Sequence, residues 1–162
     1  MRRIVIVLGV ASLALVVGCP MPPSPAAQMQ TTAIDFNTNV RFGRMELAIE
    51  HVAPKEREEF MEHRKGWGST VHLADYEMVG AHMKSEEDAE VSVRYSWYRP
   101  DQGDLHLTTV RQKWKELKGD WMLVAEARSD GDLGIFGEPV PLQDQSRAPA
   151  NVQFPTVRFG ND

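Results

Sequence analysis

The sequence predicts an α+β fold in which short N-terminal helices pack on a curved, four-stranded antiparallel meander. Hydrophobic residues recur at helical spacing in the first half of residues 33–130 and alternate with polar residues in the second half. The first pattern is typical of amphipathic helices and the second of half-buried strands. Short polar turns separate the alternating segments, which indicates consecutive hairpins. The sequence therefore predicts one small domain with a single hydrophobic core.

Three short helices are expected before the strands. In the middle one, hydrophobic residues follow the i, i+3, i+4, i+7 spacing of a helix face: Met45, Ala48, Ile49 and Val52. The same segment also alternates like a strand, but only over its first five residues. A second helix is expected to begin at Pro54, which suits a first helical turn, and to end at Gly66. It should direct Phe60 and Met61 inward. A further short helix is expected upstream, around Phe36.

Four strands are expected after the helices. They are the segments 71–83, 90–97, 106–114 and 121–127, separated by turns at 85–88, 100–103 and Lys118-Gly119. Turn positions fix the pairing, because side chains alternate between the two faces of a sheet. The predicted pairs are Met78–Tyr95, Gly80–Val93, Trp97–His106, Tyr95–Thr108, Val93–Val110, Trp114–Leu123, Gln112–Ala125 and Val110–Ala127. The solvated face should carry Arg94, Arg111, Lys113 and Glu126.

The N-terminus has the features of an export signal followed by a lipid-attachment site. Arg2 and Arg3 precede an uncharged stretch, residues 4–18, that is shorter than the roughly 20 apolar residues of a membrane-spanning helix. The residues that lead into Cys19 resemble the lipobox of bacterial lipoproteins. The resemblance implies cleavage before Cys19, diacylglycerol on its thiol and acylation of the new N-terminus with palmitate. A conventional signal peptide with an incidental cysteine and a transmembrane anchor are the alternatives.

The chain is expected to divide into four parts. They are a lipoprotein signal peptide (1–18), the lipidated Cys19 with a proline-rich extended tether (19–32), the α+β domain (33–130) and a Gly/Pro-rich tail (131–162). Within the tail only residues 152–159 have the composition of a strand. Pro155 would restrict that strand to the edge of a sheet, because proline cannot donate to a central ladder.

The arrangement of short helices and a curved meander resembles the NTF2-like fold, which includes SnoaL-like and cystatin-like domains. Residues 42–60 resemble the helical opening of such domains in bacterial envelope proteins. Residues 108–124 resemble their last hairpin, with Gln112, Trp114 and Trp121 in matching places. The resemblance implies that the helices lie across the concave face of the sheet and leave a pocket there. Some members are enzymes, others bind ligands or proteins, so the fold alone selects no activity.

The predicted register gathers polar aromatic and imidazole groups on the concave face. The candidate pocket-lining residues are Tyr76, Tyr95, His106 and Gln112, with His72 and Thr108 on the same face. We call the space between the helices and the concave face of the sheet the cone. A histidine and two tyrosines in such an apolar cone can transfer protons. The resemblance implies that enzymes of this fold use an acidic base in the cone. The predicted register puts no carboxylate there, since Asp75, Glu77 and Glu90 face the other way, and no catalytic residue is assigned.

No metal ion, cofactor or nucleic acid is expected as a partner. The five histidines show neither HxH nor HxxxH spacing, and Cys19 is the only cysteine. The formal net charge of −5 becomes more negative when Arg2 and Arg3 leave with the signal, which argues against nucleic-acid binding. Neither a P-loop nor a G-x-S-x-G motif occurs.

The sequence therefore favours a membrane-anchored envelope lipoprotein whose domain is a non-catalytic binding module for a protein or a small hydrophobic ligand. Lipid on Cys19 would attach it to a membrane, with the outer membrane favoured over the inner one. The alternative is a SnoaL-like enzyme that acts on a small cyclic substrate through His106 and Tyr95. A cystatin-like protease inhibitor is a more distant alternative, and a homodimer formed through the sheet is compatible with the fold.

Overall fold

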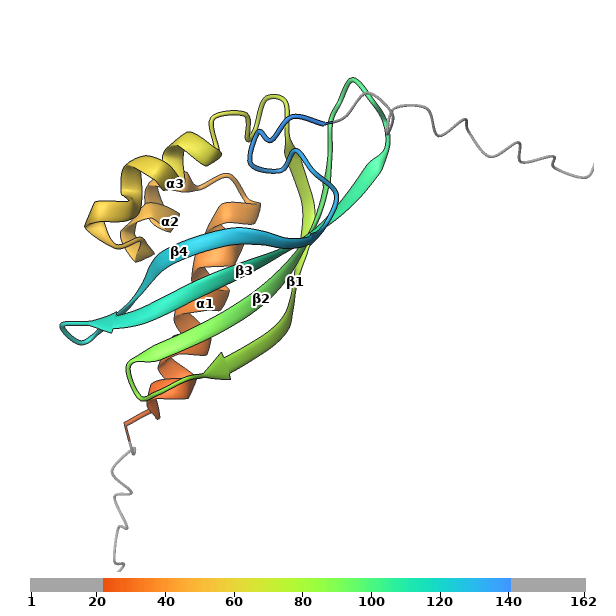
Figure 1. Cartoon of the computed structure of the whole chain (residues 1–162). Helices are drawn as coiled ribbons and strands as arrows, with labels where there is room; N and C mark the ends of the chain where they lie inside the picture. The colour runs from red at the N-terminus through yellow and green to blue at the C-terminus, as the bar shows by residue number, and fades with distance from the viewer. Residues whose placement is uncertain (1–21, 141–162) are drawn as a thin grey trace, which may run out of the picture.

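The computed structural model describes residues 22–140 and has the predicted α+β architecture (Figure 1). All helices precede all strands: α1 (Pro25–Arg41), α2 (Met45–Ala48) and α3 (Arg57–His63), with 3₁₀ turns at Ile49–His51 and Pro54–Glu56. The strands are β1 (His72–Met83), β2 (Asp88–Tyr98), β3 (Leu105–Leu117) and β4 (Asp120–Gly131). They form one antiparallel sheet in the order β1-β2-β3-β4, so the predicted meander is confirmed.

Helix α1 is longer than the sequence pattern indicated and occupies most of the expected tether. Ser24 caps it by accepting a hydrogen bond from the backbone N–H of Ala27 (3.3 Å), and Pro25 stands in the first turn, where an N–H would have no helical partner. The prediction of an extended chain over 25–32 is therefore wrong. The prolines precede or open the helix, and the uncharged Ala, Gln and Met residues that follow are good helix formers.

The inner face of α1 packs on the concave side of the sheet (Figure 1). Phe36 is fully buried and meets Trp114 of β3 edge-on, with ring centroids 5.4 Å apart. Its ring centroid also lies 5.8 Å from that of Phe60 in α3. These contacts join two helices and the sheet into the single core that the chain length predicted.

The second helical segment is broken into short pieces. Helix α2 continues only as a 3₁₀ turn, and Val52 then leaves the helix to form a bridge with Leu123 of β4. In α3, Phe60 is buried as predicted, whereas Met61 is 42% exposed, so its predicted inward orientation is wrong. Neighbouring residues on a helix point about 100° apart, and a short helix on a sheet buries a single narrow stripe.

The register between β2 and β3 is the predicted one, with the pairs Trp97–His106, Tyr95–Thr108 and Val93–Val110. Between β3 and β4 the pair Trp114–Leu123 is confirmed. An irregularity follows, and the next pairs are Gln112–Glu126 and Val110–Arg128 instead of the predicted Gln112–Ala125 and Val110–Ala127. An extra residue in one strand moves every later side chain to the opposite face. Glu126 therefore faces the concave side, and its prediction as a solvated residue is wrong.

The register between β1 and β2 also differs from the prediction, because β1 contains two irregularities. The pairs are Met78–Val93, Gly80–Ser92 and Tyr76–Tyr95, whereas Met78–Tyr95 and Gly80–Val93 were predicted. Tyr76 keeps the predicted face. His72 does not: it pairs with Tyr98 and stacks on that ring, with centroids 5.4 Å apart, on the outer side of the sheet.

Beyond β4 the chain packs back against the domain. Ile135 is fully buried, and the hydroxyl of Thr108 donates to the carbonyl oxygen of Asp132 (2.8 Å). The packed domain thus continues past the expected boundary at residue 130. Residues 1–21 and 141–162, which include Cys19 and the expected edge strand at 152–159, lie outside the described range.

The outer face of the sheet carries charged side chains that pair across strands. Glu90 of β2 accepts contacts from Lys84 (2.7 Å) and from Arg111 of β3 (3.2 Å), which together lower the pKa of its carboxyl group. Arg94 lies 3.3 Å from Glu77. This is the solvated face that the sequence predicted for Arg94 and Arg111. Within residues 22–140, no helix has the length and hydrophobicity that crossing a membrane requires.

Candidate functional site

The centre of the concave face is occupied by a buried hydrogen-bond network of Asn37, Tyr95 and Gln112. The hydroxyl of Tyr95 donates to Asn37 Oδ1, which also accepts from Gln112 Nε2 (3.0 Å). Asn37 Nδ2 donates to Gln112 Oε1 (3.2 Å) and to the carbonyl of Ala33 (2.7 Å). All three side chains have no solvent exposure. Buried polar groups are stable only when they are paired, and these pair with one another.

Tyr95 is held in its neutral form by this environment. Burial raises the pKa of its hydroxyl far above the ordinary value, and the nearby negative charge of Glu126 acts in the same direction. The hydroxyl already donates to Asn37 and accepts from Gln112 Nε2 (3.1 Å). The hydrogen bonds of this hydroxyl are therefore made inside the core.

Large aromatic side chains fill the rest of the cone. Trp97 and Trp114 are each 1% exposed, and Phe36 of α1 is fully buried against Trp114. The indole N–H of Trp97 donates to the hydroxyl of Thr108 (2.9 Å), so this ring is fixed as well as packed. The concave face is thus a closed core.

The predicted pocket residues are divided by this core into separate environments. Tyr95 and Gln112 lie together inside it. Tyr76 lies at the edge, where its hydroxyl is 2.9 Å from the hydroxyl of Thr38 and donates to the carbonyl of Ile34 (3.3 Å). His106 stacks on Trp97 with centroids 4.4 Å apart, and its Nδ1 lies 3.3 Å from a carboxylate oxygen of Asp132. Tyr95 and His106 do not face a common space.

A buried ion pair between Arg64 and Glu126 was not predicted. Arg64 follows α3 and its side chain is inaccessible to solvent, while the side chain of Glu126 is 6% exposed. The guanidinium binds both carboxylate oxygens, with Nη2 2.8 Å from Oε2. Fork-on-fork pairing of this kind is the strongest geometry for arginine and carboxylate. The cone therefore does contain a carboxylate, that of Glu126, but this carboxylate is bound to Arg64.

Three aromatic rings surround the guanidinium of Arg64. Its central carbon lies 3.9 Å from the centroid of Phe60, 4.7 Å from that of Trp67 and 5.4 Å from that of Phe136. Cation–π attraction of this kind is strongest when the cation is shielded from water. The sequence gives only an indirect signal for Glu126. The alternation assigns its neighbours Ala125 and Ala127 to the core face, although alanine is smaller than the other residues assigned to that face.

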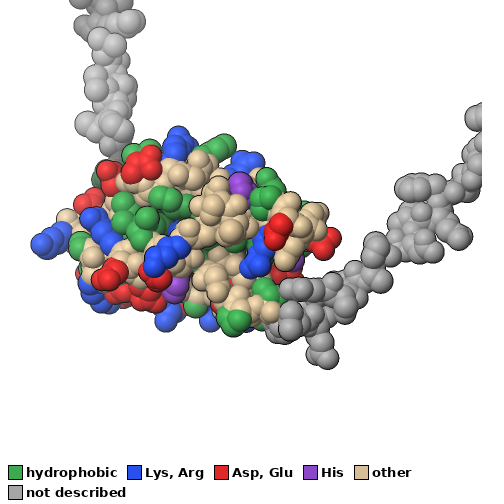
Figure 2. Space-filling view, turned by 90° about the horizontal axis from the view of Figure 1, so that it is seen from above, with side chains coloured by type: hydrophobic (Ala, Val, Ile, Leu, Met, Phe, Trp, Pro, Cys, Tyr) green, Lys and Arg blue, Asp and Glu red, His purple; other side chains and the backbone are tan. Residues whose placement is uncertain are grey.

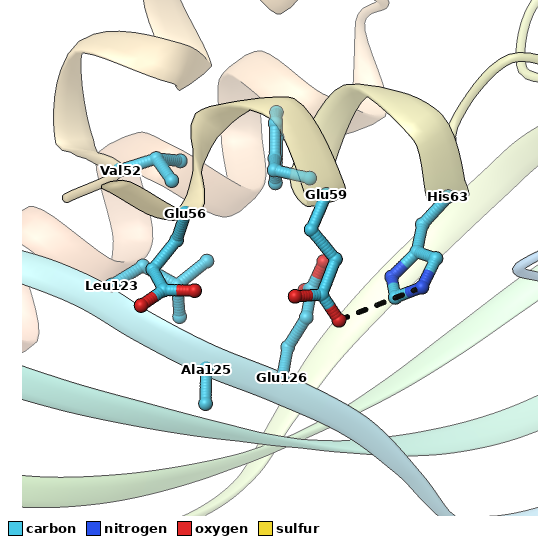
Figure 3. A pocket seen from close by; sticks show the side chains of 8 residues that line it. Val52, Glu56, Glu59, His63, Leu123, Ala125 and Glu126 are labelled. Atoms are coloured by element: carbon cyan, nitrogen blue, oxygen red, sulfur yellow. Dashed lines mark ion pairs between the residues drawn. The ribbon is translucent and has the colours of Figure 1, made fainter. Parts of the chain in front are cut away.

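The pocket beside this ion pair is small and acidic (Figure 3). It lies between α3 and β4 and has a volume of about 70 Å³, well below the roughly 300 Å³ of a typical ligand site. Its carboxylates already have partners: Glu126 binds Arg64, Glu59 lies 3.9 Å from His63, and Glu56 lies 3.2 Å from Lys55. Within the described residues no group of three or more His, Cys, Asp or Glu side chains is arranged to hold a metal ion.

Two larger pockets share residues of the loop that joins α3 to β1, and one of them lies at the C-terminal end of α1. The α1 pocket has a volume of about 240 Å³ and is lined by Val40, Arg41, Phe42, Gly43, Met45, Trp67, Gly68, Val71, His72 and Leu73. The C-terminal pocket has a volume of about 310 Å³ and is lined by Glu62, His63, Lys65, Gly66, Trp67, Thr70, Val71, Arg99 and residues 134–137. Trp67 and Val71 line both. Tyr76, Tyr95, His106 and Gln112 line none of the three pockets.

The C-terminal segment forms one wall of the larger pocket. Trp67 donates its indole N–H to the carbonyl of Ile135 (2.7 Å), and its ring is parallel to that of Phe136, with centroids 6.3 Å apart. The carboxylate of Glu138 accepts from the backbone N–H groups of Gly134 (3.0 Å) and Phe136 (2.9 Å). These bonds hold the segment against the domain and give the pocket a defined shape.

Comparison with known proteins identifies the fold. No protein-family model matches the chain, and no curated protein matches it. Among solved structures, a SEC-C motif containing protein from Rhodopseudomonas palustris matches with a TM-score of 0.54 and 15% identity, over 67% of this chain and 83% of that one. A ketosteroid isomerase-like protein from Erwinia carotovora atroseptica matches with a TM-score of 0.50 and 14% identity, over 65% of this chain and 96% of that one.

At these identities the likeness concerns the fold alone. The match to the ketosteroid isomerase-like protein agrees with the helices and the curved, open antiparallel sheet of this chain. The resemblance inferred from the sequence is thereby confirmed in part: the chain has the NTF2-like fold.

Proposed function

We propose that this protein is a lipid-anchored binding module of the bacterial cell envelope, without catalytic activity of its own. The observation that carries the proposal is the closed cone. Asn37, Tyr95 and Gln112 bond to one another inside it, and its carboxylate, on Glu126, is paired with Arg64. A general acid or base must reach the substrate with a proton to give or accept. Tyr95 and Glu126 instead bind other side chains of the domain.

The alternative of a SnoaL-like enzyme requires His106 and Tyr95 to act on one substrate. The two side chains belong to different surroundings: Tyr95 bonds inside the core, and His106 lies on the face of Trp97 beside Asp132. No observation favours that reaction, and the binding module is retained.

The position of α1 supports a tethered arrangement. The helix begins at Pro25, six residues after Cys19, and its 17 residues span about 25 Å at 1.5 Å each. Arg41 and Phe42, at its far end, line the α1 pocket. A lipid on Cys19 would therefore hold the N-terminal end of α1 near the membrane, and the two larger pockets would face away from it.

Lipid attachment can be tested in a bacterial host that expresses the full chain. Cells are fed an alkyne-tagged palmitate, and the protein is recovered, coupled to a fluorophore and compared with Cys19→Ser. We expect label on the wild-type chain and in the membrane fraction, and loss of both in Cys19→Ser, because Cys19 is the only thiol.

A matched control keeps the test specific to the cysteine. Ser24→Ala alters a nearby residue of the same region without removing the thiol and should remain labelled. An unlabelled wild-type chain would overturn the lipid anchor. Label that persists in Cys19→Ser would overturn the assigned attachment site.

A further inference from the structure

The C-terminal pocket contains an arginine whose charge is not matched by a carboxylate. Arg99 follows β2, is partly buried and lines the pocket. Its guanidinium lies 5.9 Å from the ring centroid of Trp97 and forms no ion pair or side-chain hydrogen bond with any other residue from 22 to 140. Partly buried arginines usually bind carboxylates or phosphates through their fork of N–H donors.

The other basic side chains that line this pocket have partners. Lys65 contacts Glu62, and the ring of His63 lies 3.9 Å from Glu59. The hydroxyl of Thr70 donates to the carbonyl of Gly66 (3.1 Å). Among the described residues that line the pocket, Arg99 is therefore the basic residue without a carboxylate partner, and its N–H donors can bind a ligand.

The backbone leaves room for this arginine at Gly134. This residue has a φ of +107°, and a Cβ at its position would lie 2.7 Å from Nη2 of Arg99. Any larger residue would displace the guanidinium. The close approach places Arg99 at one end of the pocket, against the C-terminal segment.

Several other residues that line the pocket are apolar or aromatic. They are Trp67, Val71, Ile135 and Phe136, and the rings of Trp67 and Phe136 are parallel, with centroids 6.3 Å apart. Basic, acidic and hydrophobic side chains are interspersed over the face of the molecule seen in Figure 2. Aromatic lining residues and one unpaired guanidinium together favour a ligand that carries both a ring and an anionic group.

We propose that the C-terminal pocket binds a small aromatic carboxylate, with Arg99 on the carboxylate and the ring against Trp67 and Phe136. This inference rests on the proposed function, since it names the ligand class of the binding module. It also separates the binding site from the cone, which is closed.

The fluorescence of Trp67 provides a direct readout. The chain has four tryptophans, and Trp97, Trp114 and Trp121 are at most 4% exposed, whereas Trp67 is only partly buried and lines the pocket. The full chain, purified in a non-ionic detergent, is titrated with 4-nitrobenzoate, which quenches indole emission on contact. The neutral isostere 4-nitrobenzamide is the matched ligand, and free N-acetyltryptophanamide corrects for absorption by the probe.

We expect saturable quenching by 4-nitrobenzoate and at least tenfold weaker binding of the amide. Arg99→Gln should weaken the carboxylate about tenfold, to the level of the amide, because an ionic hydrogen bond is lost while the apolar wall remains. Arg99→Lys should restore part of the difference. Lys113→Gln, which removes an exposed positive charge from the outer face of β3, should change neither ligand. Trp67→Phe should remove the quenching signal.

Equal binding of the acid and the amide would overturn the anion site, as would unchanged carboxylate affinity in Arg99→Gln. Far-UV circular dichroism and melting temperature establish that each variant is folded before it is titrated. Absence of any quenching would overturn the pocket assignment, yet it would leave the lipid label on Cys19 unaffected. The failure of this inference is thus distinguishable from failure of the lipid-anchored module.

Discussion

Arg64 and Glu126 form a bidentate ion pair across the interior of the domain, between the end of α3 and strand β4, with side chains 0% and 6% exposed. The pair closes the side of the cone at which an acidic base would otherwise be available. It also links the helical layer to the sheet.

Removal of one partner should be costly. Arg64→Met keeps an apolar side chain of similar length but leaves the carboxylate of Glu126 buried without a counter-charge. Such a change typically costs about 3–5 kcal/mol of unfolding free energy. Urea denaturation followed by circular dichroism measures it.

The double variant Arg64→Met/Glu126→Met is the control for this prediction. It removes both charges, so it should be more stable than Arg64→Met alone. If the two variants unfold at the same urea concentration, the carboxylate of Glu126 is solvated in the single variant and the pair is not a buried one.

Tyr95→Phe should destabilise the domain by about 1–3 kcal/mol, because Asn37 and Gln112 lose a hydrogen-bond partner in a site that water does not reach. Tyr98→Phe changes a tyrosine on the outer face that is 36% exposed, and it should stay within about 0.5 kcal/mol of the wild type. Equal effects of the two changes in urea denaturation would show that the buried network contributes nothing specific.

The raised pKa of Tyr95 predicts a loss of stability at alkaline pH. Below the ordinary tyrosine pKa of about 10, both the folded and the unfolded chain keep this proton. Above it, the unfolded chain releases the proton while the folded chain retains it, so the unfolding free energy falls as the pH rises. Between pH 9 and 11, Tyr95→Phe should therefore lose less stability than the wild type. A parallel pH dependence of the two proteins would contradict the raised pKa.

The sequence pattern predicted the four strands and the register between β2 and β3 correctly. Alternation from Val91 to Trp97 placed the buried face of β2 correctly, and the turn after Pro100 was centred well enough to give the β2–β3 pairing. The irregularity near Leu123 could not be seen, because a bulge adds a residue without changing the local composition. For that reason Glu126 was assigned to the wrong face.

Contacts made by isolated residues were equally hidden. Ile135 lies in the short stretch Gly134-Ile135-Phe136-Gly137, which shows no helix or strand period to mark a core residue, and only the structure shows that it is buried. The N-terminal part of α1 was missed for the opposite reason. Its prolines dominated the composition, although Pro25 occupies the one helical turn in which proline is favourable.

Ile135→Ala should cost about 2–5 kcal/mol, because it removes three carbons of a fully buried side chain and leaves a cavity beneath the C-terminal segment. Ile34→Ala is the matched control: the same atoms are removed from a residue of α1 that is 50% exposed, and stability should change by less than about 0.5 kcal/mol. Thermal denaturation distinguishes them. Similar melting temperatures would mean that residues 132–138 are not part of the cooperative domain.

Two glycines with positive φ angles provide the last comparison. Gly131, at the end of β4, has a φ of +85°, and a Cβ there would lie 2.2 Å from the carbonyl oxygen of Leu107 and 3.0 Å from Cα of Thr108. Gly119, in the β3–β4 turn, has a φ of +98°, but no atom lies within 4 Å of its Cβ position. Gly119→Ala should therefore cost only the conformational strain, roughly 1–3 kcal/mol.

Gly131→Ala should cost clearly more than Gly119→Ala, because the added carbon meets backbone atoms of β3, which cannot rotate away as a side chain can. The strand would have to separate from β3 near Thr108, whose hydroxyl fixes both Trp97 and the start of the C-terminal segment. Urea denaturation of the two variants measures the difference. Equal losses would show that β4 does not approach β3 this closely, and that the C-terminal segment is held by Ile135 and Trp67 without support from the end of the strand.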